Sequence, residues 1–114
     1  MSAEKRKGDV FERGVAVVFR ACGHPDAERV LRLGARDDRG DITGIGAVHL
    51  DCKNHARLQL AAWVDEVVAE APPGTLPCVV VKRARAPIAR AYVVIELATF
   101  ARLIAPPHYG NGAA

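Results

Sequence analysis

The segment 76–82 limits the folds open to this chain more than any other stretch of the sequence. Residues 78–81 read Cys-Val-Val-Val without a polar interruption, and β-branched residues favour a strand. Successive side chains of a strand point to opposite faces, so an unbroken apolar strand must be covered on both sides. We therefore expect a central strand with other elements packed against both of its faces.

The segment Ala47–Lys53 predicts a strand of a different kind, because apolar and polar residues alternate along it. With a period of two, one face carries His49, Asp51 and Lys53. The apolar residues between them fall on the other face and can enter a core. A histidine in such a position is more often solvated than a ligand, so we expect His49 at the surface.

Apolar periodicity predicts the remaining elements. Residues at helical spacing indicate helices over 9–21, 57–71 and 97–104. Short apolar stretches between turn residues indicate strands over 42–45 and 91–96. Residues 27–33 allow a short strand or a helical turn, and we favour a strand. The order is helix, three strands, helix, two strands and helix, which predicts one α/β domain over residues 1–104. We expect residues 105–114, rich in proline and small residues, to form a disordered tail.

Composition excludes several classes of protein. Half of the 114 residues are hydrophobic, so the chain can bury a core. Three well-separated cysteines without a CxxC pair argue against a disulfide framework and for a reducing compartment. No apolar run approaches the roughly 20 residues that span a bilayer. We therefore expect a cytoplasmic protein with no membrane partner.

The charge balance is basic, with a net charge of +3 and a pI of about 9.0. Such a balance suits either a polyanionic partner or a solvated, arginine-rich surface. Four cations lie in the loop between the last two predicted strands, where they repel one another unless an anion docks, so we interpret this loop as a DNA-backbone contact. The predicted DNA-binding residues are Lys7, Arg36, Arg39, Lys82, Arg83, Arg85 and Arg90. The alternative for Arg36 and Arg39 is pairing with the adjacent Asp37 and Asp38.

Asp41, Asp51 and Lys53 indicate a site for phosphate chemistry. Two glycines punctuate the connection between the predicted strands, so a tight hairpin over 42–53 would place Asp41 beside Asp51. Two carboxylates can bind Mg²⁺, which lowers the pKa of a bound water and offsets charge on a phosphoryl oxygen. A neighbouring ammonium can stabilise the transition state. The alternative is a surface strand with an exposed ion pair.

Gly40-Asp41, a short spacer and the run apolar-Asp51-Cys52-Lys53 resemble the active-site signature of the PD-(D/E)XK nuclease superfamily, with Gly40 in place of the commoner proline. The segment Lys7–Arg13 resembles the start of the first helix in archaeal-type and phage-encoded Holliday junction resolvases. The resemblance covers about residues 5–104. It implies the restriction-endonuclease-like αβββαβ core, a mixed central sheet flanked by helices.

The resemblance also implies roles for individual residues. Asp41 and Asp51 would hold Mg²⁺, for which Mn²⁺ substitutes, together with the backbone carbonyl of Cys52. Glu12 would complete the metal site directly or through water, and Lys53 would position the nucleophilic water. The alternative for Glu12 is a first-turn helix acid favoured by the helix dipole.

The implied activity is that of a metal-dependent, structure-selective endodeoxyribonuclease, a Holliday junction resolvase acting on branched or double-stranded DNA. Two paired cuts across a junction require a twofold homodimer. A phage-encoded enzyme of this kind would act in the host cytoplasm. The alternatives are a nicking or flap nuclease of the same superfamily, a non-catalytic DNA-binding module on the same fold, and a small RNA-directed nuclease toxin.

Overall fold

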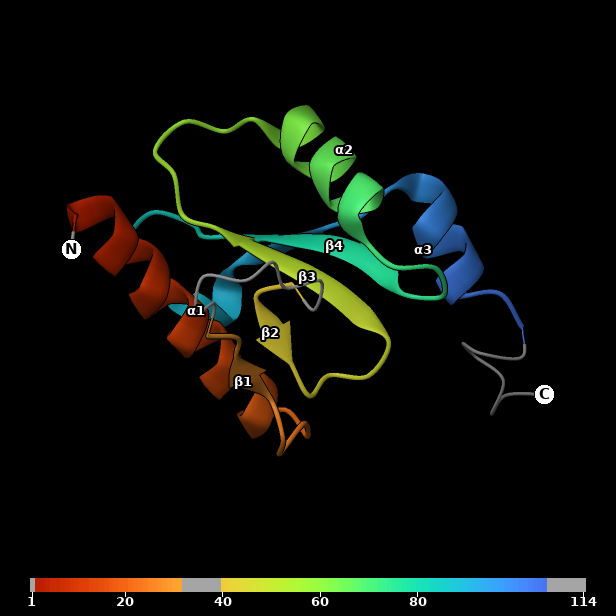
Figure 1. Ribbon diagram of the computed structural model, residues 1–114, viewed down its shortest axis with the longest axis horizontal. Coiled ribbons are helices and arrows are strands. Elements are labelled where there is room, and N and C mark those ends of the chain that lie inside the picture. The colour runs from red at the N-terminus through yellow and green to blue at the C-terminus, as the bar shows by residue number, and fades with distance from the viewer. Residues whose placement is uncertain (1, 32–39, 107–114) are drawn as a thin grey trace.

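The computed structural model describes residues 2–31 and 40–106 (Figure 1). Over this part of the chain the elements are α1 (Ala3–Ala21), β1 (Glu28–Arg29), β2 (Ile42–Thr43), β3 (Val48–Lys53), α2 (Leu60–Glu70), β4 (Leu76–Val81), the 3₁₀ turn η1 (Ile88–Arg90), β5 (Tyr92–Val94) and α3 (Leu97–Leu103). Their order confirms the predicted sequence of helices and strands, and the chain is an α/β domain. Arg36, Arg39 and most of the predicted tail lie outside the described residues.

Helix α1 begins at Ala3, well before the predicted start at Asp9. Ser2 caps the helix, because its hydroxyl accepts a hydrogen bond from the Lys5 N–H (3.1 Å). The residues that follow include alanine, glutamate, lysine and arginine, which have high helix propensity. Asp9 is therefore not a capping residue. It lies inside the helix and forms an ion pair with Arg29.

Several other elements are shorter than predicted. The differences concern β1 (predicted 27–33), β2 (42–45), β5 (91–96) and α2 (57–71). The length of a strand depends on its ladder partner. Among the described residues, β1 pairs with Ile42 and Thr43, and β5 pairs with Val79–Val81. Val30 and Ile95, which follow these pairs, therefore stay outside the strands. Residues 32 and 33 of the first predicted strand lie outside the described residues.

The main sheet is mixed, with the strand order β3-β4-β5. β3 runs parallel to β4, and the register places Asp51 opposite Val79 and Lys53 opposite Val81. β5 is antiparallel to β4. Parallel strands need a crossover connection, and α2 supplies it between β3 and β4 (Figure 1).

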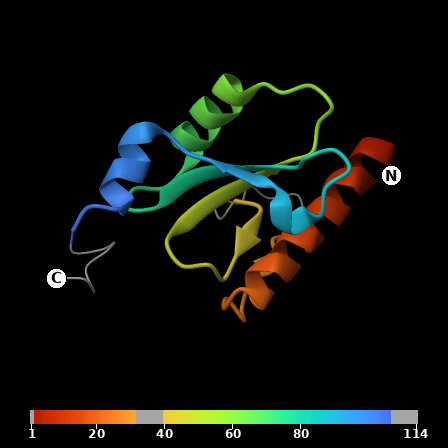
Figure 2. The same cartoon turned by 180° about the vertical axis from the view of Figure 1, so that it is seen from behind.

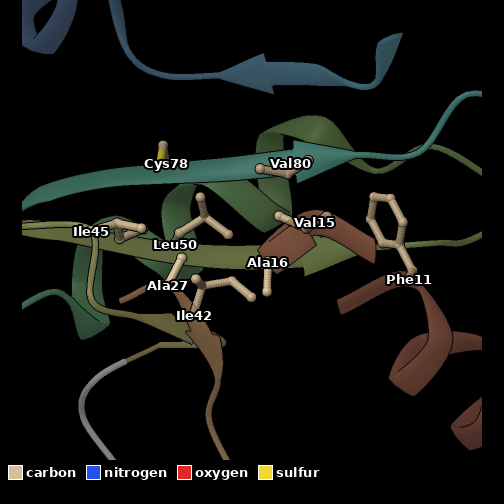
Figure 3. Packing of buried hydrophobic residues seen from close by; sticks show 9 residues of the cluster. All are labelled: Phe11, Val15, Ala16, Ala27, Ile42, Ile45, Leu50, Cys78 and Val80. Carbon is tan, nitrogen blue, oxygen red and sulfur yellow. The ribbon is translucent and has the colours of Figure 1, made fainter. Parts of the chain in front are cut away.

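The central strand β4 is buried on both faces, as predicted. Cys78 and Val80 belong to a core cluster that includes the apolar side chains of α1 (Figure 3). Val79 and Val81 belong to a second cluster with Trp63 of α2, so this tryptophan covers the sheet. Because alternate residues of one strand face opposite ways, α1 and α2 cover opposite faces of the sheet.

Strand β2 pairs with β1 and not with β3, so the predicted hairpin over 42–53 is wrong. β1 supplies the ladder partners of β2, and the two strands form a separate antiparallel pair. Asp41 joins this pair to the main sheet: its N–H donates to the Leu50 carbonyl (2.8 Å), and its carbonyl accepts from the Val30 N–H (2.9 Å). Asp41 therefore still lies beside β3, although by a different route.

Helix α3 directs most of its apolar side chains outward. Leu97, Phe100 and Leu103 are 82%, 46% and 47% exposed, whereas Thr99 is buried. The predicted apolar face of this helix is thus not part of either core cluster. Among the helices of residues 2–31 and 40–106, none is long and apolar enough to cross a bilayer.

Candidate functional site

Strand β3 presents Asp51 and Lys53 on the face that α2 covers. Leu50 points the other way, into the α1 core, so the predicted alternation of this strand is confirmed. The Lys53 ammonium lies 3.4 Å from a carboxylate oxygen of Glu66 and 6.0 Å from the centroid of the Trp63 ring. The predicted carboxylate and ammonium thus share one face of β3, against side chains of α2.

Three acidic side chains meet at this face. Oxygens of Asp51, Glu66 and Glu70 lie within 4.8 Å of one another, and they form the one such group among the described residues. We did not predict the two glutamates as site residues. A signal for them exists, because Glu66 and Glu70 are four residues apart beside the Trp63–Val67 stripe and therefore occupy one edge of α2.

Asp51 is held in surroundings that disfavour its charge. The residue is 9% exposed, and within the described residues no hydrogen bond reaches its carboxylate. Burial raises the pKa of Asp51 to about 6, with further increases from the charges of Asp41 and Glu70, against lowering by Lys53 and His49. Such a carboxylate, with two others beside it, suits a hard divalent cation, which would offset the repulsion.

His49 is 3% exposed, so the prediction of a surface histidine is wrong. Its ring shares the face of Asp51 at the opposite end of β3 from Lys53. His49, Pro72 and Thr75 line one small cavity, which places the turn after α2 against this end of the strand. Tertiary cover from that turn removes the histidine from solvent.

Asp41 lies at the edge of β3. Its carboxylate accepts a hydrogen bond from the Cys52 N–H (2.7 Å), between the positions of the two predicted partners on the strand. Gly40 makes this approach possible, because it adopts a φ of +79° and a Cβ there would lie 2.8 Å from the Leu50 carbonyl oxygen. Sterics therefore explain why glycine stands at this position, where the sequence signature more commonly has proline.

Glu12 faces β1 from helix α1. The Arg29 Nε lies 3.1 Å from a Glu12 carboxylate oxygen, and another guanidinium nitrogen lies 2.8 Å from Asp9. Arg29 thus links two acids on successive turns of α1. The pairing depends on how β1 packs against α1, which no local sequence pattern encodes.

The thiol of Cys52 marks where the predicted acids come together. Burial raises its pKa, and the charges of Asp41, Glu12 and Asp51 raise it further. All three predicted carboxylates are therefore close enough to act on one residue. Only Asp51, however, belongs to the acidic group on the α2 side, because Asp41 binds the Cys52 amide and Glu12 binds Arg29.

The structure describes five of the predicted DNA-binding residues, and three of them lie together. Lys7, Lys82 and Arg83 line a common pocket. Arg85 and Arg90 are exposed on the connection between β4 and β5, where Arg85 has a φ of 59°. Figures 1 and 2 both place this connection beside the N-terminal part of α1.

No protein-family model, curated protein or solved structure matches this chain. A function for it therefore follows from the side chains of the site and from their chemistry.

Proposed function

We propose that this protein is a metal-dependent DNA endonuclease of the PD-(D/E)XK type, with the restriction-endonuclease-like αβββαβ core. The observation that carries the proposal is the face of β3. Asp51 and Lys53 stand two residues apart on it, and the Asp41 carboxylate binds the amide of the residue between them. Two acids and one lysine in this arrangement can hold a cation and offset the charge that develops during phosphodiester hydrolysis.

The metal centre of this proposal is built around Asp51. Asp41 and the Cys52 carbonyl are the further ligands that the resemblance implies, with Glu12 behind them. Glu66 and Glu70 supply two more carboxylates on the α2 side of Asp51. Mg²⁺ fits such oxygen donors, and Mn²⁺ accepts the same set. When bound, the ion lowers the pKa of a water and offsets charge on a phosphate oxygen.

Lys53 supplies the fixed positive charge of the proposed site. Its ammonium lies next to the acidic group and is 20% exposed as a side chain, so it is accessible to a phosphate. Lys53 orients the nucleophilic water and stabilises the developing negative charge. Its partner in the structure is the Glu66 carboxylate.

The substrate of the proposed enzyme is branched or double-stranded DNA, and a Holliday junction is the preferred form. The basic pocket residues and the exposed arginines between β4 and β5 supply backbone contacts, which position DNA without reading its bases. Paired cuts require two copies of the site, so we propose a homodimer. The exposed apolar residues of α3 are the part of the described surface that suits a second copy.

One observation favours a second candidate, a non-catalytic DNA-binding module on the same fold. Lys53 is paired with Glu66, and Glu12 is paired with Arg29. A scaffold that has lost catalysis can satisfy its charged groups internally in this way. Metal binding separates the two candidates, because the module has no need of a cation at Asp51.

The test is cleavage of a labelled four-way junction, fork, flap, plain duplex and single strand in Mg²⁺, Mn²⁺ or chelator. Lys53→Ala and Asp51→Asn should each lower the rate by about 100-fold or more, because each removes a group from the transition state. Asp65→Asn is the matched control, since Asp65 is exposed on α2 and outside the acidic group. DNA binding and far-UV circular dichroism should remain close to wild type.

Each outcome of this assay has a distinct meaning. Symmetric, metal-dependent cuts in the junction alone support a resolvase, whereas cuts in forks or flaps support a nicking or flap nuclease. Wild-type turnover by Lys53→Ala would overturn the assignment of the site. Tight junction binding without cleavage, unaffected by metal, would establish the non-catalytic module instead.

A further inference from the structure

A second concave site lies next to the candidate centre, beyond the ends of β3 and β4. It has a volume of about 510 Å³, within the range of small-ligand pockets. The loop after β3, the loop after β4, the N-terminal part of α1 and the start of β5 all contribute to it. Both cartoon views show these segments gathered at one end of the molecule (Figures 1 and 2).

The charge of this pocket is one-sided. Lys7, Lys82 and Arg83 line it, and none of the described residues that line it is acidic. Asn54 and His55 add polar groups that can donate hydrogen bonds. The Lys82 ammonium donates to the Arg83 backbone carbonyl (3.2 Å), which holds it beside the guanidinium residue of the pocket. Three cationic residues around one hollow make its potential positive. The chemistry of the walls therefore favours an anionic group such as a phosphate.

The pocket also has aromatic and apolar walls. Tyr92 lines it and is 57% exposed, and the Arg83 guanidinium lies 4.8 Å from the centroid of its ring. Leu58 and Val81 add aliphatic surface. Free phosphate needs no such walls, whereas a nucleotide has a flat base that stacks on aromatic rings and guanidinium planes.

We infer that this pocket holds one unpaired nucleotide of a DNA strand, with its phosphate among the cations and its base against Tyr92 and Arg83. The inference deepens the proposed function and rests on it, because it names the part of the substrate that lies beside the cut. A base in a continuous duplex is stacked and cannot enter a pocket. A base at a junction, fork or flap is free to do so.

The position of the pocket suits this role. Lys82 donates its backbone N–H to the Lys53 carbonyl (3.0 Å), and Asn54 follows Lys53 directly. The ring of His55, a lining residue, lies 5.4 Å from that of Trp63, the residue over which the Lys53 ammonium sits. A nucleotide in the pocket is therefore adjacent to the lysine of the candidate site.

Binding in chelator tests the inference without reference to catalysis. The probes are a fluorescent oligothymidylate and an abasic oligonucleotide of equal length, which carry the same phosphates and differ only in their bases. By fluorescence anisotropy, the wild-type protein should bind the thymine strand about tenfold more tightly. Tyr92→Ala should abolish that preference, and Tyr92→Phe should keep it.

Arg83→Gln should weaken binding of both probes, because the phosphate contact is common to them. The slope of log affinity against log salt should fall by about 0.7 for the lost contact with a single strand. Arg102→Gln is the matched control, since Arg102 is exposed on α3 and does not line the pocket. It should change neither the affinity nor the preference for thymine.

Three results would overturn the inference. They are equal binding of the two probes by wild type, an unchanged preference in Tyr92→Ala, and binding of thymidine monophosphate as tight as that of the strand. The last would identify a free-nucleotide site. A Tyr92-dependent preference in a protein that cleaves no DNA would refute the nuclease and still support the pocket, so the two failures are distinguishable.

Discussion

Asp51 carries a charge that burial and neighbouring acids destabilise in the folded state. It is a buried carboxylate beside two glutamates, with Asp41 near the other side of the strand. Its pKa of about 6 lies above the ordinary value of 3.8, so the folded state holds the Asp51 proton more tightly than the unfolded state does. Stability therefore falls as pH rises from about 4 to 6, and the full penalty is present at pH 7.

Replacing this charge should stabilise the fold. At pH 7 and without divalent metal, Asp51→Asn should raise the free energy of unfolding by about 1 kcal/mol, after allowance for solvent screening. The gain should disappear near pH 4, where the wild-type carboxyl is protonated in the folded state. Urea unfolding at the two pH values measures both effects. Asp65→Asn, an exposed change on α2, should leave the pH dependence unaltered, and an equal gain at both pH values would show that Asp51 is not the cause.

At the scale of the elements, the attachment of the β1–β2 pair to β3 depends on the backbone around Asp41. Gly40 allows it through a positive φ and the absence of a Cβ against Leu50. Gly40→Ala should therefore lower the free energy of unfolding by about 2 kcal/mol or more, because the cost of a left-handed alanine and the cost of the clash with Leu50 add together. It should also displace the Asp41 carboxylate from the Cys52 amide.

Gly8→Ala provides the control for this prediction. Gly8 lies within α1, and a Cβ there meets nothing within 4 Å. Alanine is the better helix former, so this variant should gain about 0.5–1 kcal/mol. Thermal or urea unfolding of the two variants gives the comparison. A Gly40→Ala protein as stable as wild type, with unaltered metal binding, would contradict the role given to this glycine.

Some strands of the structure could be predicted from the sequence and others could not. The apolar run of β4 and the alternation of β3 predicted both strands closely, since burial on two faces or on one leaves a distinct pattern of residues. The pairing of β2 with β1 could not be predicted, because two-residue strands carry almost no periodic signal. For the same reason Arg29, the partner of Glu12, had no visible role.

The part of the candidate site that lies on one strand was predictable from the sequence. The part that the tertiary fold brings together was not. Asp51 and Lys53 share a strand, so a period of two is enough to place them together. The approach of Glu66 and Glu70 depends on the crossing of α2 over the sheet, and the cover of His49 depends on the turn that follows. Both are tertiary facts, and single-residue patterns do not contain them.

At the scale of the whole molecule, we expect exposed arginines near the basic pocket to contribute to DNA binding. Arg85 and Arg90 are exposed on the connection between β4 and β5, whose first residues line the basic pocket. Replacing both by glutamine should weaken binding to a four-way junction and lower the magnitude of the salt slope by about 1.8, or 0.9 for each phosphate contact with duplex arms. Arg13 and Arg102, also exposed, supply a control pair with the same change in net charge.

Anisotropy titrations across a range of salt concentrations measure this effect. The control pair should leave the slope close to wild type, because the loss of net charge alone does not remove a phosphate contact. Equal slopes for the two double variants would show that the arginines between β4 and β5 act only through the overall charge of the protein.

The parallel pairing of β3 with β4 has a kinetic consequence. Asp51 lies on β3 and the two glutamates on the α2 crossover, so their oxygens come together only after the crossover has closed onto the sheet. Closing a parallel pair is a slow, non-local event, because the loop-closure entropy must be overcome before the contacts form. We therefore expect this pair to close late in folding. A cation held there would bind the folded β3–α2–β4 unit and not the partly folded states that precede it. It would therefore slow unfolding, with little effect on the folding rate.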